Sequence, residues 1–423
     1  MRLNLSSQIT LKRIPKKYYR PENDFEEYIL TRFEKIPTYI YEDMHEASKV
    51  VADEIVKNLL QKQKEGKPFV MGICGGASPQ HIYEELVRRH KEENISFRNL
   101  VVFNIYEYYP VTDITQSNLQ MLKDVFLDRI DIDPKNIYSP DPAVEKDLIA
   151  ETCVAYEEAL ESYGGLDYLL LGLGSKGNIG FNMPGSNPNS RTRLVMLDGD
   201  SRRDSISIFG SLDKVPISAI TMGISDMMEA RQITLIAWGE QKAESIKEMV
   251  EGRVSESMPA SFLQTHPNAK VVIDLSAASN LTRISYPWLV TSCDWNNKLI
   301  RRAIVWLCDK VDKPILKLTN KDYSDNGLSE LLTIYGSAYN VNIKIFNDLQ
   351  HTITGWPGGK PNADDTYRPE RAKPYPKKII IFSPHPDDDV ISMGGTFQRL
   401  VNQGHEVHVA YQTSGNIAVN DEE

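Results

Sequence analysis

Short apolar runs that alternate with helical patterns constrain the fold of this chain more than any other feature. Residues 47–63 carry apolar side chains at helical spacing, and Pro79 begins a second helical pattern. Short runs that are apolar at nearly every position indicate strands buried on both faces. Such runs occur at residues 69–74, 100–104, 166–174, 232–239 and 270–274. The pattern predicts an α/β fold, in which a Rossmann-like, mostly parallel sheet has helices on both faces.

Shifts in composition divide the 423 residues into segments. Residues 1–40 are polar and are predicted to be an N-terminal extension, whereas residues 41–285 carry the α/β alternation. Residues 286–350 are predicted to form a helical or mixed connecting region. Residues 351–377 are rich in Pro, Asp and Arg, which is typical of a linker. A new apolar run then begins a C-terminal α/β fragment over residues 378–423.

The charge and composition exclude several classes of partner. The net charge is −10, with 58 acidic and 48 basic side chains, so no basic face for a nucleic acid is expected. No apolar run approaches the ~18 residues that span a bilayer. The N-terminus has no apolar signal segment, so we expect a cytoplasmic protein without a membrane partner. A homo-oligomer remains open. The absence of a CxxC pair predicts reduced thiols at Cys74, Cys153, Cys293 and Cys308.

A loop of small residues follows the first predicted strand. Gly75, Gly76, Ala77 and Ser78 lie between that strand and the helical pattern that begins at Pro79. In a parallel sheet such a loop lies at the carboxyl ends of the strands, where ligands bind. Free backbone N–H groups at a helix N-terminus suit an anion, and Ser78 adds a hydroxyl. Taken alone, the loop fits a structural turn equally well.

Six sequence blocks, taken in order, resemble the glucosamine-6-phosphate deaminase family over about residues 40–285. One block is Gly-Gly-Ala-Ser-Pro at 75–79, and another is Leu-Gly-Leu-Gly-Ser-Lys-Gly-Asn-Ile-Gly-Phe-Asn-Met-Pro at 171–184. The others lie at 103–110, 189–193, 219–224 and 239–243. The resemblance implies a small hexose or amino-sugar phosphate as the ligand and no cofactor for this domain. It assigns the phosphate to Gly75, Gly76, Ala77, Ser78 and Lys242.

The acid–base positions of that family hold different residues here. The resemblance implies an aldose–ketose isomerisation with loss of ammonia, which needs a carboxylate base and a ring-opening His. The proton-moving Asp falls on Tyr106, the second Asp on Lys176, the His on Asn178 and the Glu on Met183. Tyrosine titrates near ~10, and Asn and Met carry no titratable proton, so no matching groups remain for this mechanism. Glu107, which the family shares, is a candidate substitute base.

These departures predict a hexose-phosphate-binding domain with lost or much reduced deaminase activity. The alternative is an active deaminase that forms fructose 6-phosphate and ammonia with substitute residues. A phosphogluconolactonase-like hydrolase has less support, because that chemistry uses the same missing residues. The family's phosphate arginine falls near Ser207, and Arg202 and Arg203 are the candidates to replace it.

Residues 382–389, Phe-Ser-Pro-His-Pro-Asp-Asp-Asp, resemble the signature of PIG-L-like zinc-dependent N-deacetylases. The resemblance makes His385 and Asp388 zinc ligands and Asp387 the general base. Catalytic zinc takes three protein ligands and a water, so these residues form an incomplete site. About 45 residues are too few for that whole domain, and zinc is expected only where the domain is complete. His405 and His408, in the next predicted strand, are poor substitutes for the missing ligand.

Overall fold

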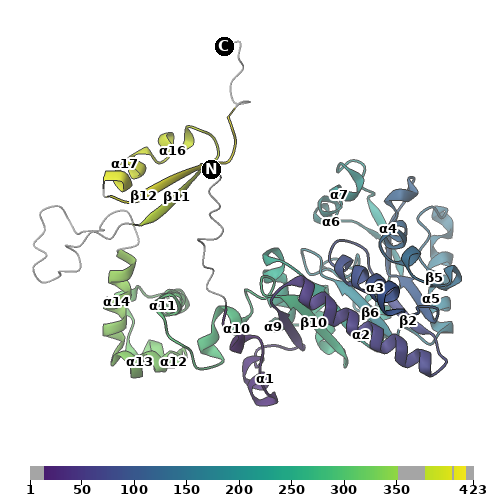
Figure 1. Cartoon of the computed structure of the whole chain (residues 1–423), viewed down its shortest axis with the longest axis horizontal. Helices are drawn as coiled ribbons and strands as arrows, with labels where there is room; N and C mark the ends of the chain where they lie inside the picture. The colour runs from purple at the N-terminus through teal and green to yellow at the C-terminus, as the bar shows by residue number, and fades with distance from the viewer. Residues whose placement is uncertain (1–13, 351–376, 403, 416–423) are drawn as a thin grey trace, which may run out of the picture. The chain divides into compact units, whose positions relative to one another are not determined.

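The buried apolar runs form the strands of one parallel sheet in the first part of the chain (Figure 1). This computed structural model describes residues 14–350, 377–402 and 404–415, and the chain divides into two units, Met1–Thr291 and Ser292–Glu423. Among the described residues, the main sheet has seven strands in the order β1-β10-β9-β6-β2-β3-β5, and every neighbouring pair is parallel. The prediction of a mostly parallel α/β sheet is confirmed. Its strands are β1 (Thr38–Tyr41), β2 (Phe69–Ile73), β3 (Leu100–Asn104), β5 (Ile137–Tyr138), β6 (Tyr168–Gly172), β9 (Ile233–Ala237) and β10 (Ala269–Asp274).

Helices connect the strands and flank the sheet (Figure 1). The longest, α2 (Met44–Lys64), begins after Asp43, whose side chain accepts hydrogen bonds from the N–H groups of His45 and Glu46. This N-cap satisfies backbone donors that the first helical turn leaves open. The other α-helices of the first unit are α1 (Asp24–Leu30), α3 (Gln80–Glu93), α4 (Asn118–Val125), α5 (Ile149–Ser162), α6 (Gly199–Asp204), α7 (Ile206–Phe209), α8 (Ile224–Met228), α9 (Ala243–Glu251) and α10 (Thr282–Ser285).

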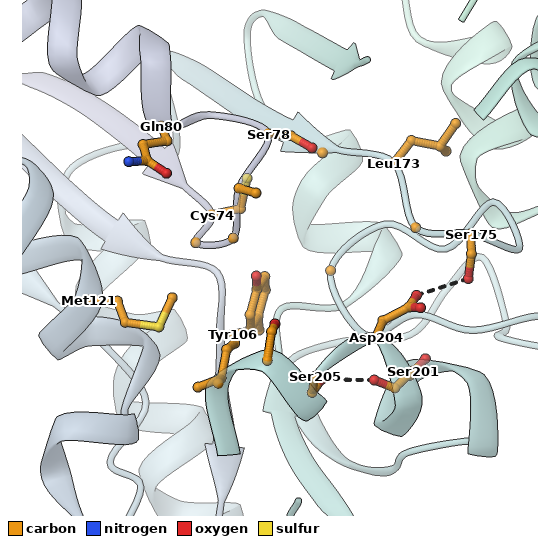
Figure 2. Close-up of a pocket in the computed structure, with 18 of the residues that line it drawn as sticks. Cys74, Ser78, Gln80, Tyr106, Met121, Leu173, Ser175, Ser201, Asp204 and Ser205 are labelled. Atoms are coloured by element: carbon orange, nitrogen blue, oxygen red, sulfur yellow. Dashed lines mark hydrogen bonds between the residues drawn. The ribbon is translucent and has the colours of Figure 1, made fainter. Parts of the chain in front are cut away.

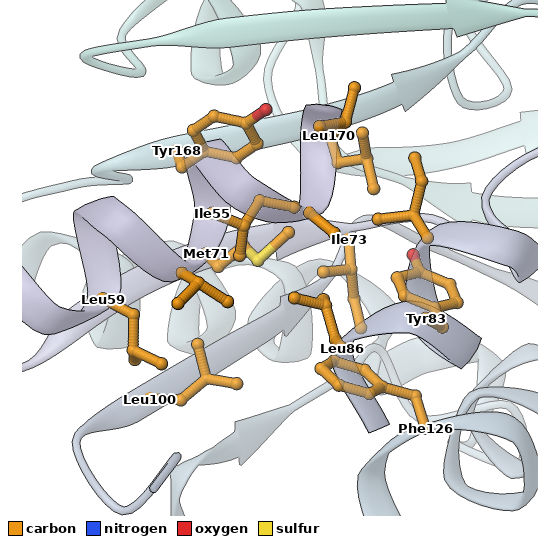
Figure 3. Packing of buried hydrophobic residues seen from close by; sticks show 14 of the residues in the cluster. Ile55, Leu59, Met71, Ile73, Tyr83, Leu86, Leu100, Phe126, Tyr168 and Leu170 are labelled. Atoms are coloured by element: carbon orange, nitrogen blue, oxygen red, sulfur yellow. The ribbon is translucent and has the colours of Figure 1, made fainter. Parts of the chain in front are cut away.

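The main hydrophobic core lies between the sheet and helices α2 and α3 (Figure 3). Every residue of β2 is buried, and Met71 and Ile73 have no exposed surface. Ile55 and Leu59 of α2 belong to the same cluster. Burying an apolar side chain of this size contributes about 1.5–3 kcal/mol relative to leaving it exposed. Coverage of both faces explains why these strands are apolar at every position rather than at alternate positions.

A second sheet, which is antiparallel, follows directly from the main one. Its strands are β4 (Tyr106–Tyr109), β8 (Ser218–Thr221) and β7 (Arg193–Met196), in the order β4-β8-β7, and β4 begins just after β3 ends. Tyr108, Phe181 and Phe209 pack together in a small core beside this sheet. Because Phe209 ends α7, this core attaches the short helices α6 and α7 next to the carboxyl end of β3.

The described part of the N-terminal extension packs on the first unit. β1 begins at Thr38 and pairs with β10, so the sheet starts before residue 41. Arg283 of α10 places Nε 2.8 Å from Glu34 Oε1, and its Nη2 donates to Thr38 O at 2.7 Å. Both charged side chains are buried, so this ion pair joins the start of the sheet to the last helix of the unit.

The second unit contains helices and a two-stranded parallel sheet among its described residues. Phe382 is 67% exposed and Ile380 is 53% exposed on the first of these strands, in contrast to the fully buried β2. No helix in the described residues of either unit is both long and apolar enough to cross a bilayer. The elements of the second unit are α11 (Asn297–Val311), α12 (Asn320–Asp325), α13 (Ser329–Tyr335), α14 (Ala338–Gln350), β11 (Lys378–Ser383), α16 (Asp388–Ile391), α17 (Gly394–Asn402) and β12 (Glu406–Tyr411).

Candidate functional site

A cavity of about 1070 Å³ opens at the carboxyl ends of the central strands. β2 and β6 are neighbours in the sheet. The chain continues from β2 to β3 on one side of this pair, and from β6 to β9 on the other side, so the strand order reverses between them. Ligands of open α/β sheets bind at such a switch in strand order, because the two loops diverge there and leave a crevice. Residues of the loops 74–78 and 173–178, and of the segment 238–242 after β9, line this cavity.

Two glycines shape the loop that follows β2. A Cβ atom on Gly75 would lie 1.8 Å from Asn118 Oδ1, so no side chain fits there. Gly76 has a φ of +94°, which side chains other than glycine rarely adopt. Both positions therefore require glycine, and the loop offers its backbone rather than side chains at this end of the cavity.

The carbonyl groups at the two ends of the loop are held by side chains from other elements. Tyr83 Oη donates to Cys74 O at 2.6 Å, and Trp238 Nε1 donates to Ser78 O at 2.7 Å. The N-terminus of α3 follows the loop. Backbone N–H groups that have no acceptor and lie at a helix N-terminus are a favourable environment for an anion. Within the part of the chain that the structure describes, no acceptor takes the backbone N–H groups of Gly76, Ala77 and Ser78.

Lys242 lies between β9 and α9, and its side chain lines the same cavity as the loop. Burial lowers the pKa of Lys242, and the carboxylate of Asp204 acts in the opposite direction. No carboxylate among the described residues forms a direct ion pair with the Lys242 ammonium. A partly buried cation without a contacting counter-ion suits an anionic ligand such as a phosphate.

Tyr106 stands between the loop after β2 and the helices α6 and α7 (Figure 2). Its ring centroid is 4.6 Å from that of Phe181, and its hydroxyl is 4.0 Å from the point where a Cβ atom of Gly76 would lie. Burial holds the pKa of Tyr106 well above its ordinary value, and the hydrogen bond with the Gly75 backbone offsets this only in part. The phenol therefore stays protonated at neutral pH, where it donates a hydrogen bond and does not act as a base.

Glu107 does not line the cavity, and its carboxylate is fully used by neighbouring donors. Oε1 accepts from the N–H groups of Tyr108 and Asn118 at 2.9 and 2.7 Å, and Oε2 accepts from Ser117 Oγ and Leu119 N at 2.8 and 2.9 Å. Burial raises the pKa of Glu107, although these hydrogen bonds lower it. The carboxylate fixes the first turn of α4, and the structure does not bring this candidate substitute base to the cavity.

The other family positions are divided between two cavities. Asn178 lines the large cavity together with Tyr106. Lys176 and Met183 instead line a neighbouring cavity of about 570 Å³, and Lys176 forms an ion pair with Asp200. The four positions that the resemblance groups together therefore do not meet around one ligand site in this chain.

Neither candidate for the phosphate arginine reaches the large cavity. Arg202 donates to two backbone carbonyl oxygens, the nearer at 2.8 Å, and Arg203 forms an ion pair with Asp200. Ser207, near which the resemblance places the family's arginine, does line the cavity. Among the described residues that line it, Lys242 is thus the only lysine or arginine.

Several residues of the cavity lie outside the recognised sequence blocks. Asp204 Oδ2 accepts a hydrogen bond from Ser175 Oγ at 3.1 Å, and His81 on α3 has Nδ1 2.9 Å from Glu84 Oε2 (Figure 2 shows the first contact). The i,i+3 spacing of His81 and Glu84 was the one local signal for this pair. No local signal marked the hydroxyls of Ser201, in α6, and Ser205, between α6 and α7.

His385 and Asp388 lie side by side in the second unit, with His385 Nδ1 2.9 Å from Asp388 Oδ2. Asp387 is exposed at the N-cap position of α16. His405 and His408 are hydrogen-bonded to other groups. No group of three or more His, Cys, Asp or Glu side chains in the described residues is placed to hold a metal. The residues present therefore fit part of a zinc site and not a complete one.

Comparisons with known proteins give relatives for both parts of the chain. The family model described as glucosamine-6-phosphate isomerases/6-phosphogluconolactonase matches residues 42–273, and the model described as GlcNAc-PI de-N-acetylase matches residues 380–423. A glucosamine-6-phosphate deaminase-like protein of Bacteroides thetaiotaomicron is 64% identical over 424 residues, which is 100% of this chain and 64% of the relative. Glucosamine-6-phosphate deaminase 1 of Bacillus subtilis is 37% identical over 241 residues, 56% of this chain and 96% of the relative. The solved structure of a monomeric glucosamine-6-phosphate deaminase superposes with a TM-score of 0.55 at 33% identity, covering 58% of this chain and 100% of the other.

Proposed function

The chain belongs to the glucosamine-6-phosphate isomerase/6-phosphogluconolactonase family, and we propose that its first unit binds a hexose phosphate with lost or much reduced deaminase activity. One observation carries the proposal: Lys242 and the loop after β2 line one cavity, which has a neutral phenol where the resemblance places a base. The relative in Bacteroides thetaiotaomicron extends well beyond the length that this chain spans, and the proposal concerns the first unit alone.

Support for phosphate binding comes from the loop after β2 and from Lys242. The loop supplies unused backbone N–H groups and the Ser78 hydroxyl, and both elements line one cavity. Hydrogen bonds between a phosphate and charged or backbone donors are stronger than those between neutral groups. The resemblance places the family's arginine near Ser207, where this chain has none, so a single lysine remains and we expect weaker binding than in a site with two cations.

Support for lost activity comes from the groups that face the same cavity. A tyrosine would need its pKa lowered by ~3 units, about 4 kcal/mol, to act as a base at neutral pH. Burial moves the pKa of Tyr106 in the opposite direction. Glu107 is held by four donors, and Asn178 has no proton to exchange at neutral pH. Each positioned acid or base is worth about 10²–10⁴ in rate, so their loss removes most of the family's catalysis.

Binding is tested by thermal unfolding of the full chain with and without glucose 6-phosphate. At a ligand concentration of about 100 times Kd, the expected stabilisation is ~2.7 kcal/mol. Lys242→Ala should lose most of this gain, whereas Lys57→Ala, on the exposed face of α2, should keep it. An absent stabilisation, or one that Lys242→Ala leaves intact, would contradict the proposed site.

Activity is tested by incubating the same protein with glucosamine 6-phosphate and measuring ammonia. We expect release no higher than in a protein-free blank. Turnover of ~1 s⁻¹ or more, at the low end of ordinary enzymes, would reject the claim of lost activity.

An active deaminase with substitute residues is the second candidate function. The observation in its favour is that His81, paired with Glu84, and the carboxylate of Asp204 line the cavity. If ammonia is released, His81→Gln and Asp204→Asn identify which group has taken over proton transfer, because each variant removes one titratable group and keeps a similar shape.

A further inference from the structure

We propose that the large cavity selects hexose phosphates whose ring substituents are neutral, including acylated amines, over those that carry a free ammonium group. The inference rests on the proposed function and specifies its class of ligand. It follows from how charge is distributed over the cavity lining, which has an ionic outer part and a neutral inner wall.

The carboxylates of the lining lie at exposed positions. Asp204 accepts a hydrogen bond from Ser175 and acts electrostatically on Lys242, so it belongs to the anion-binding end. Asp124, in the last turn of α4, accepts a hydrogen bond from Gln120 at 2.8 Å. Both Asp204 and Asp124 are exposed to solvent. In the described lining, no further Asp or Glu side chain is present to balance an ammonium group.

The inner wall is aromatic and uncharged. The ring centroids of Tyr106 and Phe181 are 4.6 Å apart, and those of Tyr108 and Phe181 are 5.3 Å apart. The Asn178 amide lies in the same lining, and Tyr108 is held in place by a hydrogen bond to Ser205 Oγ at 3.0 Å. Glu107, the carboxylate between Tyr106 and Tyr108 in the sequence, does not line the cavity.

An ammonium group and an acylamino group on the ligand differ in the interactions that they can make with this inner wall. An ammonium beside Tyr106 and Phe181 gives up water and finds no counter-ion, and attraction to the aromatic rings recovers only part of the lost hydration. An amide carbonyl can accept a hydrogen bond from the Tyr106 hydroxyl, whose oxygen already accepts one from the Gly75 backbone. An acyl methyl group can pack on the Phe181 ring. The same wall accepts a neutral hydroxyl without this cost.

The test is calorimetric titration of the full chain at neutral pH with three ligands that share the phosphate: glucose 6-phosphate, glucosamine 6-phosphate and N-acetylglucosamine 6-phosphate. The first two match in size, so their difference isolates the ammonium charge. We expect glucosamine 6-phosphate to bind about tenfold or more weakly than either neutral ligand. Equal or tighter binding of glucosamine 6-phosphate would overturn the inference and leave the proposed function intact. Failure of all three ligands to bind would instead reject the proposed function.

Two variants locate the selection in the inner wall. Asn178→Asp adds a carboxylate of almost unchanged shape and should reduce the discrimination against glucosamine 6-phosphate to about threefold or less. Tyr106→Phe removes only the hydroxyl, so it should weaken N-acetylglucosamine 6-phosphate relative to glucose 6-phosphate by about threefold to tenfold and keep the discrimination against the amine. An unchanged ligand preference in both folded variants would show that the inner wall does not set the selection.

Discussion

The first unit and the C-terminal segment of the second unit differ in which part of a functional site they contain. The first unit has the fold and the cavity but not the expected acid–base residues, whereas the described part of the C-terminal segment has the motif residues but not a complete site. In the first unit, the central strands of the main sheet are buried and a cavity is formed, yet the positions that the resemblance assigns to acid–base groups hold Tyr106, Lys176, Asn178 and Met183. In the described part of residues 377–415, the motif residues His385, Asp387 and Asp388 are present, yet the strand before them carries an exposed Phe382 and no third metal ligand is in place.

This difference teaches that a binding site built from backbone tolerates change better than a site built from converging side chains. The loop proposed to bind phosphate needs two glycines and a helix start, and these lie within a few neighbouring residues of the sequence. A metal or acid–base site needs side chains from distant segments at the same time, and one missing member leaves it incomplete.

The largest expected effect contrasts buried and exposed isoleucines in the two regions. Ile73→Ala removes a side chain with no exposed surface from the main core and should cost about 2–5 kcal/mol of unfolding free energy. Ile380→Ala, on the half-exposed strand β11, should cost about 0.5 kcal/mol or less. Urea denaturation followed by circular dichroism measures both. Equal losses would mean that β11 is covered in solution and would remove the contrast.

A second prediction separates the structural and catalytic roles of Glu107. Glu107→Gln replaces one acceptor oxygen by an NH₂ group facing backbone donors, so it should cost about 1–3 kcal/mol of stability. The affinity for glucose 6-phosphate should stay the same, because Glu107 does not line the cavity. Denaturation and calorimetry on one preparation give both values. A stable variant with altered ligand affinity would place this carboxylate in the site after all.

The third prediction concerns the pH dependence of phosphate binding. Burial lowers the pKa of Lys242, so its positive charge is lost at a pH below the ~10.4 of an ordinary lysine. Affinity for glucose 6-phosphate should therefore fall as the pH rises through the lowered pKa of Lys242. Lys242→Arg should retain its affinity at alkaline pH, because a guanidinium stays protonated. Titrations from neutral to alkaline pH compare the two proteins, and a parallel fall in both would exclude Lys242 as the cause.

The smallest expected effect lies in the C-terminal segment. Two ligands, His385 and Asp388, hold zinc weakly, so the chain should carry well under one equivalent of zinc after gel filtration. His385→Ala should not change that content measurably. Elemental analysis provides the measurement, with unfolding curves to confirm that the variant is folded. Stoichiometric zinc that His385→Ala removes would show that another residue completes the site.

Much of the first unit was determined by patterns that are local in the sequence. The fully apolar runs predicted the buried parallel strands, because a strand covered on both faces needs apolar residues at every position. The anion-binding role of the small-residue loop before α3 remains a prediction, which rests on its backbone N–H groups and on glycine conformation. The assignment of Lys242 to the phosphate remains a prediction, which its position in the cavity lining supports.

Which side chains face the same cavity was decided by the tertiary structure alone. Glu107 and Tyr106 are adjacent in sequence, but successive side chains of a strand point to opposite faces, so only Tyr106 meets the ligand space. Arg202 and Arg203 are as basic as Lys242, yet they bind carbonyl oxygens and Asp200 instead of facing the cavity. Local sequence sets strand and helix formation through short-range sterics and hydrogen bonds. The direction of a charged side chain depends on partners that packing brings from distant segments.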